Sequence, residues 1–509
     1  MLNCVIFLAA GAPVMALSSG VFDNRRAVEG ARSAARTHVA QTNLAQVASV
    51  PTNSPQTTSV QASPGKKRVP HDIEALDEVA LLQAYIRANT SNPPGNEAPG
   101  ATFFARVFEQ YGVDYRIIES APGRANVWAR ITGGDEPGIL LLHHMDVVPA
   151  DAARWQHPPF AGIIADDYLH GRGSLDNKSA GIFHLTTFLE LHAAGEPLRR
   201  DVVFLAVADE EAGGQLGVGW LLENRPQLFA GIGAVLNEGG RGERLASKIR
   251  FAVETTQKLP LWLAVEASGE TGHGAVPKTE TAPKRLLEAL GRFNDLGFQP
   301  RLLPVTQQYL QAIAADLPEP WRTRFKEPKK LIASARQMAE LHHYDERLFA
   351  LLTNTCTVTR LTGSHKINVL PPKASAEIDC RLLPDEDPRR VEQLIAEKLL
   401  GEDEDEGVNI RRLLSFGPGH SPTDHWLYRA LEGVLAQAYP KAAVLPKLNA
   451  GFTDSHFFRE RGIAAYGFTP VILTREEGAG VHGENERISL INIKLGRSLT
   501  RAILREVVF

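Results

Sequence analysis

The chain has little cysteine and little net charge for its length. Only three cysteines, Cys4, Cys356 and Cys380, occur in 509 residues, so the sequence excludes a fold that depends on a framework of disulfides. A single bridge between Cys356 and Cys380, which both lie in strand-like runs, is left open. The net charge of −4 gives no broad basic surface, so we expect no nucleic-acid partner.

Several common functional motifs are also missing. The sequence shows no internal repeat, no dinucleotide-binding glycine fingerprint and no serine nucleophile elbow. The segment GRGSLDNKSAG contains glycines, but it lacks the GKS or GKT ending of a phosphate-binding loop. These absences argue against a nucleotide-binding protein and against a serine hydrolase.

Long apolar runs are absent beyond the N-terminus. Residues 1–17 read as a signal peptide or an N-terminal anchor, with a cleavage site near Ala16, although no Lys or Arg precedes the apolar core. Residues 18–70 are rich in Ser, Thr, Ala, Gln and Pro and predict a disordered linker. No other run reaches the roughly 18 apolar residues that span a bilayer. We therefore expect an exported protein, periplasmic or secreted, that the N-terminal segment can anchor.

Acidic and histidine side chains follow short apolar runs in several places. Such runs are typical of buried parallel strands, and ligands bind outside the carboxyl ends of the strands in an open α/β sheet. The side chains at these ends should therefore meet in one crevice. They are His144 and Asp146 after residues 139–142, Asp176 after 171–175, Asp209, Glu210 and Glu211 after 202–207, and Asn237 and Glu238 after 234–236.

These side chains suit a pair of divalent cations. Imidazole nitrogen together with carboxylate oxygen fits zinc or another late divalent metal better than calcium. Asp176 could bridge two ions about 3.5–4 Å apart, and one of Glu210 and Glu211 could act as a general base. Taken singly, Asp176 could merely cap a helix and the glutamates could be a solvated pair. Their joint occurrence at strand ends favours the metal centre.

Seven segments of the chain form a recognisable series. They are HHMDVVP, GRGSLDNKSAG, ADEEAGG, NEGG, GHGAVP, NVLPPKASAEIDCRLLP and GAGVHGENE. Together they resemble the dinuclear zinc exopeptidases and deacylases, a family that groups carboxypeptidase S, glutamate carboxypeptidase, aminoacylase, acetylornithine deacetylase and succinyl-diaminopimelate desuccinylase. The resemblance runs in the family's motif order from about residue 76 to the C-terminus.

The resemblance implies an α/β fold, with a phosphorylase/hydrolase-like catalytic domain and an inserted α+β lid of the dimerisation type. The mostly parallel central sheet of the catalytic domain would be flanked by helices. We place the two parts of the catalytic domain at residues 71–256 and 382–509, and the lid at 257–381. A polar helical stretch at 307–343 is interpreted as an enlargement of the lid.

The resemblance also implies which residues hold the metal ions. His144 and Asn237 would hold one ion, Glu211 and His482 the other, and Asp176 would bridge them. Most relatives have an aspartate where this chain has Asn237. Because an amide oxygen is neutral and a weaker donor to a cation, we expect one of the two sites to bind its ion less tightly.

The remaining motif positions imply catalytic and substrate-binding roles. Glu210 would be the general base, and Asp146 would orient a ligand histidine. His273 would reach the scissile carbonyl oxygen from the lid, in the family often from the partner subunit. Asn368 and Arg381 would bind the substrate, with the Arg381 guanidinium suited to a free carboxylate.

Two features near these motifs have less support. His143 points away from the side of His144 and is interpreted as structural or as facing the lid. The segment GFTDSHFF, at residues 451–458, could bind substrate or could form a simple turn.

We therefore predict a metallopeptidase-type hydrolase with two divalent ions, most simply zinc. It would cleave an amide or peptide bond next to a free carboxylate, as carboxypeptidase S does, in a small peptide or an N-acyl amino acid. The alternatives are an N-acyl-amino-acid deacylase of the aminoacylase type and a non-catalytic peptide-binding relative. A homodimer through the lid is a further expectation.

Overall fold

The computed structural model describes residues 76–245, 248–294, 296–401 and 407–509. The predicted N-terminal segment at 1–17 and the predicted linker at 18–70 lie outside the described residues. Within the described ranges, no helix combines the length and the apolar character that crossing a membrane requires.

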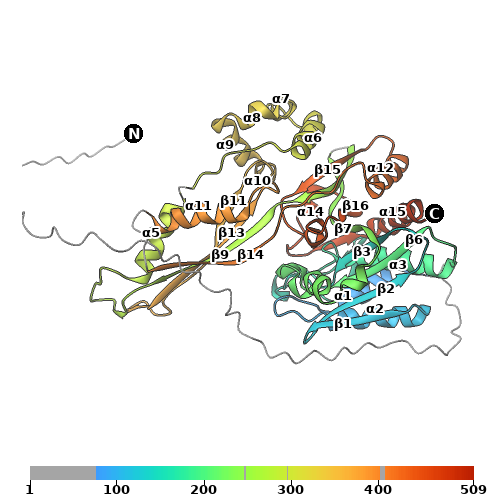
Figure 1. The fold of residues 1–509 in the computed structure, drawn as a ribbon, viewed down its shortest axis with the longest axis horizontal. Coiled ribbons are helices and arrows are strands. Elements are labelled where there is room, and N and C mark those ends of the chain that lie inside the picture. The colour runs from blue at the N-terminus through green and yellow to red at the C-terminus, as the bar shows by residue number, and fades with distance from the viewer. Residues whose placement is uncertain (1–75, 246–247, 295, 402–406) are drawn as a thin grey trace, which may run out of the picture. The chain divides into compact units, whose positions relative to one another are not determined.

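An eight-stranded sheet forms the centre of the catalytic domain (Figure 1). Strand β3 is parallel to both β6 and β7, and β7 is parallel to β16, whereas β1 and β2 add an antiparallel edge. The predicted α/β class with a mostly parallel sheet is thus confirmed. In spatial order the strands are β1 (Tyr115–Ala121), β2 (Arg124–Ile131), β6 (Arg200–Val207), β3 (Glu136–His144), β7 (Ile232–Leu245), β16 (Ala464–Leu473), β8 (Lys248–Gln257) and β15 (Ala443–Asn449).

Helices cover both faces of this sheet, which explains why the middle of a central strand such as β3 is apolar on both faces. Along β3, Ile139 and Leu141 pack into one core cluster, and Leu140 and Leu142 pack into the cluster on the other face. All four side chains are fully buried. The first face carries α1 (Glu78–Arg87), α2 (Ala98–Tyr111), α3 (Lys178–Ala194), α12 (Trp426–Ala438) and α15 (Leu490–Val508), and the second carries α4 (Trp220–Asn224) and α13 (Ser455–Arg459).

Short strands and one short helix complete the catalytic domain. A three-stranded sheet joins segments from distant parts of the chain, because β17 pairs with β5 and β5 pairs with β4. This pairing brings the turn before Asp176 close to the C-terminal segment. The elements are β4 (Ile163–Ala165), β5 (Tyr168–His170), β17 (Arg487–Ser489) and α14 (Arg475–Gly478).

The inserted domain is an antiparallel four-stranded sheet whose core also includes two helices (Figure 1). Its last strand and its second helix lie beyond residue 381, where we had placed the end of the lid. The boundary is therefore corrected to the end of β14, because β14 pairs with β9 along most of its length. The elements are β11 (Thr355–Thr362), β13 (Lys373–Leu382), β9 (Leu259–Ser268), β14 (Val408–Ser415), α5 (Ala282–Asn294) and α11 (Pro388–Leu400).

The helical stretch within the insertion packs on the catalytic sheet and not on the lid sheet, which corrects our interpretation. Its buried side chains, such as Leu310 and Phe325, share a cluster with Ala252 of β8 and with Leu445 and Leu448 of β15. The helices are α6 (Pro304–Ile313), α7 (Trp321–Lys326), α8 (Pro328–Ile332), α9 (Ala335–Tyr344) and α10 (Glu346–Ala350).

A disulfide joins two neighbouring strands of the inserted sheet. Cys356 of β11 lies directly opposite Cys380 of β13, and the two sulfurs are bonded. The bridge that the sequence left open is therefore present in the structure.

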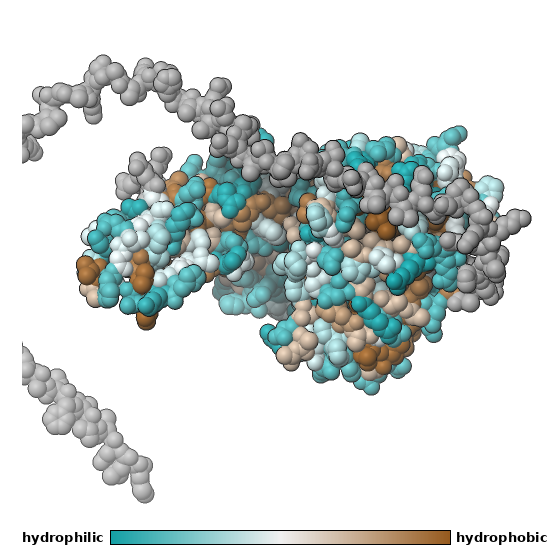
Figure 2. Space-filling model, turned by 90° about the horizontal axis from the view of Figure 1, so that it is seen from below, coloured by the Kyte–Doolittle hydropathy of each residue, from teal (hydrophilic) through white to brown (hydrophobic). Residues whose placement is uncertain are grey.

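Apolar side chains are exposed on the inserted domain (Figure 2). They include Val276, Leu361 of β11, Ile367 and Val369. Val369 belongs to β12 (Val369–Leu370), which pairs with β10 (Gly272–His273) in a two-stranded ribbon.

Candidate metal centre and substrate pocket

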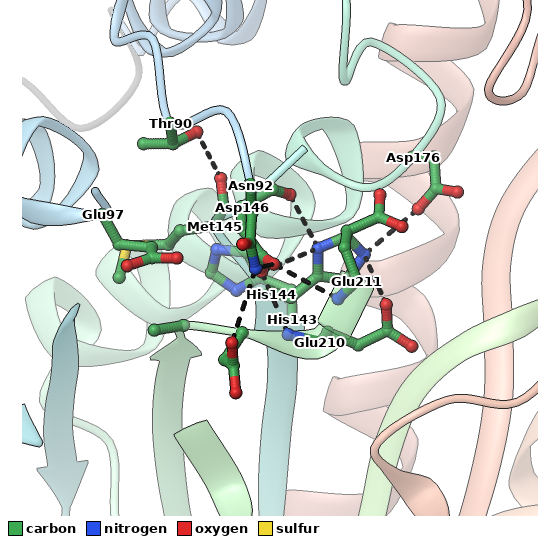
Figure 3. A network of polar contacts seen from close by, with 12 residues as sticks. Thr90, Asn92, Glu97, His143, His144, Met145, Asp146, Asp176, Glu210 and Glu211 are labelled. Atoms are coloured by element: carbon green, nitrogen blue, oxygen red, sulfur yellow. Dashed lines mark hydrogen bonds and ion pairs between the residues drawn. The ribbon is translucent and has the colours of Figure 1, made fainter. Parts of the chain in front are cut away.

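His144 lies at the carboxyl end of β3 and points into a group of carboxylates (Figure 3). Its Nε2 atom is 3.1 Å from Oδ1 of Asp176 and 3.3 Å from Oε1 of Glu238. The Nδ1 atom is 2.9 Å from the backbone oxygen of Asp146, which fixes the orientation of the ring.

Asp176 lies between the two histidines. While its Oδ1 faces His144, its Oδ2 is 3.1 Å from Nε2 of His482, and that nitrogen is also 3.2 Å from Oε2 of Glu211. The turn that carries Asp176 is held by Glu486, whose Oε1 accepts hydrogen bonds from the backbone N–H groups of Leu175 and Asp176 at 2.7 and 3.1 Å. One carboxylate thus presents one oxygen to each histidine, as a bridging ligand would.

Asp146 fixes the two adjacent glutamates as well as His144. Its Oδ1 and Oδ2 accept hydrogen bonds from the backbone N–H groups of Glu210 and Glu211, each at 3.2 Å (Figure 3). The amide of Asn92 donates to Oδ2 at 2.9 Å. The Asp146 carboxylate therefore ties the end of β3 to the loop that carries both glutamates.

A second buried network supports this loop, and sequence reasoning missed it. Arg124 donates to Glu97 and to Asp209, with ion-pair distances of 2.8 and 2.7 Å. Asp209 has a φ of 76°, a left-handed conformation that non-glycine residues rarely adopt, and it directly precedes Glu210. No local pattern could have found this network, because its members are separated by 27 and 85 residues.

The geometry favours Glu238 over the predicted Asn237 as a candidate metal ligand. The Asn237 side chain is buried, and its amide nitrogen donates to the Ser455 hydroxyl at 3.1 Å. The next residue, Glu238, points to the other side of β7 and approaches His144. The expected weakness of one metal site loses its basis, because Glu238 offers a charged carboxylate.

The electrostatics of this group favour bound cations. Five acidic side chains, Asp146 included, surround the two histidines. Burial raises the pKa of Glu238 to about 7 and that of Glu210 well above its usual range. Hydrogen bonds to Asp176 and Glu211 raise the pKa of His482 to about 10. The Oε1 atom of Glu211 is buried and has no hydrogen-bond partner among the described residues. Divalent cations would compensate this excess of buried negative charge.

The ligand atoms form two groups that share His144. One group combines His144 with Glu210 and Glu238, and the other combines it with Asp176 and Glu211. Donors of this kind, imidazole and carboxylate, fit zinc and other late divalent ions. The residues present therefore fit a metal centre with two ions.

A cavity of about 360 Å³ opens beside this centre. The acidic group and His482 line it together with Arg241, Arg381 and the rings of Trp262 and Phe452. Its apolar side chains, which we call the apolar wall, are Leu175, Val471, Leu473 and Val481. Asn449, Thr453 and Thr469 add polar side chains to the lining.

Arg381 reaches this cavity, as predicted, but its guanidinium already has a partner. Nε and Nη2 bind the two carboxylate oxygens of Asp379 at 2.7 and 3.1 Å. Its guanidinium carbon lies 4.9 Å from the ring centre of Phe452 and 5.6 Å from that of Trp262.

His273 and Asn368 do not line the cavity. They lie side by side in the inserted domain, where the backbone N–H of Gly274 donates to the backbone oxygen of Asn368 at 2.9 Å. Both side chains are exposed. Their roles stay predictions, which in this arrangement require a second subunit or a movement of the domain.

The structure gives different outcomes for His143 and for the segment 451–458, the two features with less support. His143 is buried among aromatic rings, including those of Tyr85 and Phe104, and is structural as expected. In the segment 451–458, Thr453 and Phe452 line the cavity. His456 lines no part of it and stacks on Phe416 with ring centres 3.5 Å apart.

Comparison with known proteins agrees with this geometry. The model of peptidase family M20/M25/M40 matches residues 140–506. The chain belongs to this family. Membership confirms the resemblance found in the sequence and makes the protein a hydrolase of the metallopeptidase and aminoacylase kind.

Among curated relatives, the N-fatty-acyl-amino acid synthase/hydrolase PM20D1 of Xenopus tropicalis is 28% identical over 407 residues, which cover 77% of each chain. Aminoacylase-1 of Mus musculus is 28% identical over 81% of this chain and 90% of its own. Among solved structures, the M20 family metallo-carboxypeptidase Sso-CP2 of Sulfolobus solfataricus has a TM-score of 0.68 at 20% identity, covering 85% of this chain and 99% of its own. At that identity the likeness supports the fold alone.

Proposed function

We propose that this protein is a zinc-dependent hydrolase that cleaves the amide bond of an N-acyl amino acid whose carboxylate is free. The observation that carries the proposal is the Asp176 carboxylate, which faces His144 with one oxygen and His482 with the other. Zinc is proposed because the donors are imidazole and carboxylate groups.

Two observations favour an acyl amino acid over a dipeptide as the substrate. One relative named above is an N-fatty-acyl-amino acid synthase/hydrolase by its name, and the other is an aminoacylase. In addition, every acidic residue that lines the cavity among the described residues, namely Asp176, Glu210, Glu211 and Glu238, belongs to the metal group. A free α-amino group would therefore find no carboxylate of its own, whereas the apolar wall suits an acyl chain. Cleavage of peptides with a free C-terminal carboxylate is the second candidate.

In the proposed mechanism the chain's own residues position the reactants and move one proton. His144, Asp176, Glu211, Glu238 and His482 would hold the cations, which supply a Lewis acid for the scissile carbonyl and for water. The Glu210 carboxylate accepts a proton as water adds to the carbonyl carbon. Glu210 then returns this proton to the nitrogen of the amino acid as the C–N bond breaks.

The proposal is tested by removing and restoring the metal. Hydrolysis of N-acyl amino acids should disappear after treatment with a chelator, because no protein group replaces the Lewis acid. It should return when zinc is added back. Release of the free amino acid is the measurement, and dipeptides with free and with acylated N-termini are run in parallel. Hydrolysis that survives complete removal of metal would contradict the proposal.

Glu238 and Asn237 allow a direct test of the ligand set. Replacing Glu238 by alanine should lower the metal affinity of one site. The loss should exceed roughly 10–100-fold, which is the usual cost of removing a residue that only hydrogen-bonds to a metal ligand. Asn237→Ala is the neighbouring control, and its metal content should match that of the wild type. Metal analysis after dialysis against a zinc buffer measures both. Loss of metal in Asn237→Ala, with a wild-type metal content in Glu238→Ala, would restore Asn237 as the ligand.

We also propose export and a homodimer through the inserted domain. The disulfide between Cys356 and Cys380 supports an oxidising compartment. The exposed apolar side chains of the inserted domain support a contact surface between subunits. The position of His273 outside the cavity agrees with a role in the site of a partner subunit.

A further inference from the structure

Two arginines line the cavity beside the metal centre, and they differ in their partners. Arg381 is already held at its Nε and Nη2 edge by both oxygens of Asp379. Its guanidinium also lies over the rings of Trp262 and Phe452. The charge of Arg381 is thus compensated within the protein, and the residue supports the aromatic part of the wall.

Arg241 makes no such direct ion pair with any described residue. It lies on β7, three residues after Glu238, and lines the same cavity. Within the part of the chain that the structure describes, its guanidinium has neither an ion pair nor a hydrogen bond. The nearest acidic residue along the strand, Glu243, is bound instead by Lys447 at 3.0 Å and by Tyr309 at 3.3 Å.

The surroundings of Arg241 leave room for its guanidinium. A Cβ atom at Gly478, the last residue of α14, would lie only 2.7 Å from Nη2 of Arg241, so a larger residue there would displace the side chain. Gly239 and Gly240, which separate Glu238 from Arg241, also line the cavity. The backbone between the metal ligand and the arginine therefore adds no side chains to the space that a substrate would occupy.

We propose that Arg241, and not Arg381, binds the free carboxylate of the substrate. The inference rests on the proposed function, because it assigns one end of the substrate of that reaction. A half-buried cation without a direct ion pair is unfavourable, and a carboxylate from the substrate would pair with it. The guanidinium can offer two parallel N–H donors to the two carboxylate oxygens. The acyl group would then lie along the apolar wall.

The test compares an acid with its neutral analogue. Zinc-loaded wild type, Arg241→Gln, Arg241→Lys and Arg381→Gln are assayed for kcat/KM on N-acetyl-L-leucine and on N-acetyl-L-leucinamide. In Arg241→Gln the preference for the acid should fall by about 10–100-fold, because a charge-assisted, two-point hydrogen bond is lost. Arg241→Lys keeps the positive charge but loses the two parallel donors. Its preference for the acid should therefore lie between those of the wild type and of Arg241→Gln. Arg381→Gln should slow both substrates and keep the preference.

Arg244 provides the matched control, since it is exposed on the same strand and does not line the cavity. Arg244→Gln should leave both rates unchanged. The inference is overturned if Arg241→Gln keeps the preference for the acid, or if Arg381→Gln removes it. Wild-type protein that hydrolyses neither compound would instead contradict the proposed function, and the inference would fall with it.

Discussion

Replacing Glu210 by glutamine should lower kcat by about 10²–10⁴-fold while the zinc content stays at the wild-type value. The amide has nearly the shape of the carboxylate, but it cannot accept a proton from water. The backbone N–H of Glu210 donates to Asp146 in either form, so the loop should keep its position. Steady-state kinetics and metal analysis on the same preparation measure the two quantities.

Glu211 supplies the matched comparison for this experiment. Its Oε2 atom lies 3.2 Å from His482, and we propose that it is a ligand. Glu211→Gln should therefore lose zinc together with activity, whereas Glu210→Gln should lose activity alone. Since Glu210 can share a group with His144 and Glu238, a loss of zinc in Glu210→Gln is a real alternative outcome. It would show that Glu210 is a ligand and that another group moves the proton.

Replacing Arg459 by methionine should lower the free energy of unfolding by about 3–5 kcal/mol. Arg459 of α13 binds both oxygens of Glu254 on β8, at 2.6 and 2.8 Å. Their side chains are 1% and 0% exposed. Burial raises the pKa of Glu254 even with Arg459 beside it, so the carboxylate is costly to keep charged once the arginine is gone. Unfolding in urea, followed by circular dichroism, measures the loss.

A surface arginine and a double variant control for the substitution itself. Arg461 is exposed two residues further on, and Arg461→Met should change the stability by no more than about 0.5 kcal/mol. Arg459→Met combined with Glu254→Met removes both charges and should recover much of the loss. A cost below about 1 kcal/mol in Arg459→Met would show that the Glu254 carboxylate finds another partner or is reached by water.

Strand ends are local signals, and they predicted His144, Glu210 and Glu211, whereas His482 was implied by the family resemblance alone. His144 comes two positions after the apolar run 139–142. The structure places it, with Asp176, Glu210, Glu211 and His482, in one group. Parallel strands end at the same edge of a sheet, so residues that are distant along the chain are brought together by topology.

The choice between Asn237 and Glu238 failed because both follow the same apolar run and differ only in the side of the strand that they occupy. The register of β7 shifts directly after this point, so simple alternation does not decide the question. Chemistry could have decided it, since a cation prefers a charged carboxylate oxygen to a neutral amide oxygen.

Tertiary packing explains the other misses. The amphipathic helices between residues 304 and 350 could cover either sheet, and nothing in their pattern specified β15. In the same way, β14 carries no sequence signal that would assign it to the inserted sheet. It belongs there because it pairs with β9 in the folded chain. The pairing of Arg124 with Glu97 and Asp209 depends equally on contacts that only the folded chain makes.

The proposed role of His482 has a consequence for when the protein can first become active during its synthesis. Translation completes the segments that carry His144, Asp176 and Glu238 long before position 482 leaves the ribosome. Until then Asp176 has only one of the two imidazoles that flank it in the finished molecule. N-terminal parts of a protein tend to fold first, so the nascent chain passes through a stage with a sheet but an incomplete centre. Because we propose His482 as a metal ligand, we expect catalysis to begin only after residue 482 has been translated.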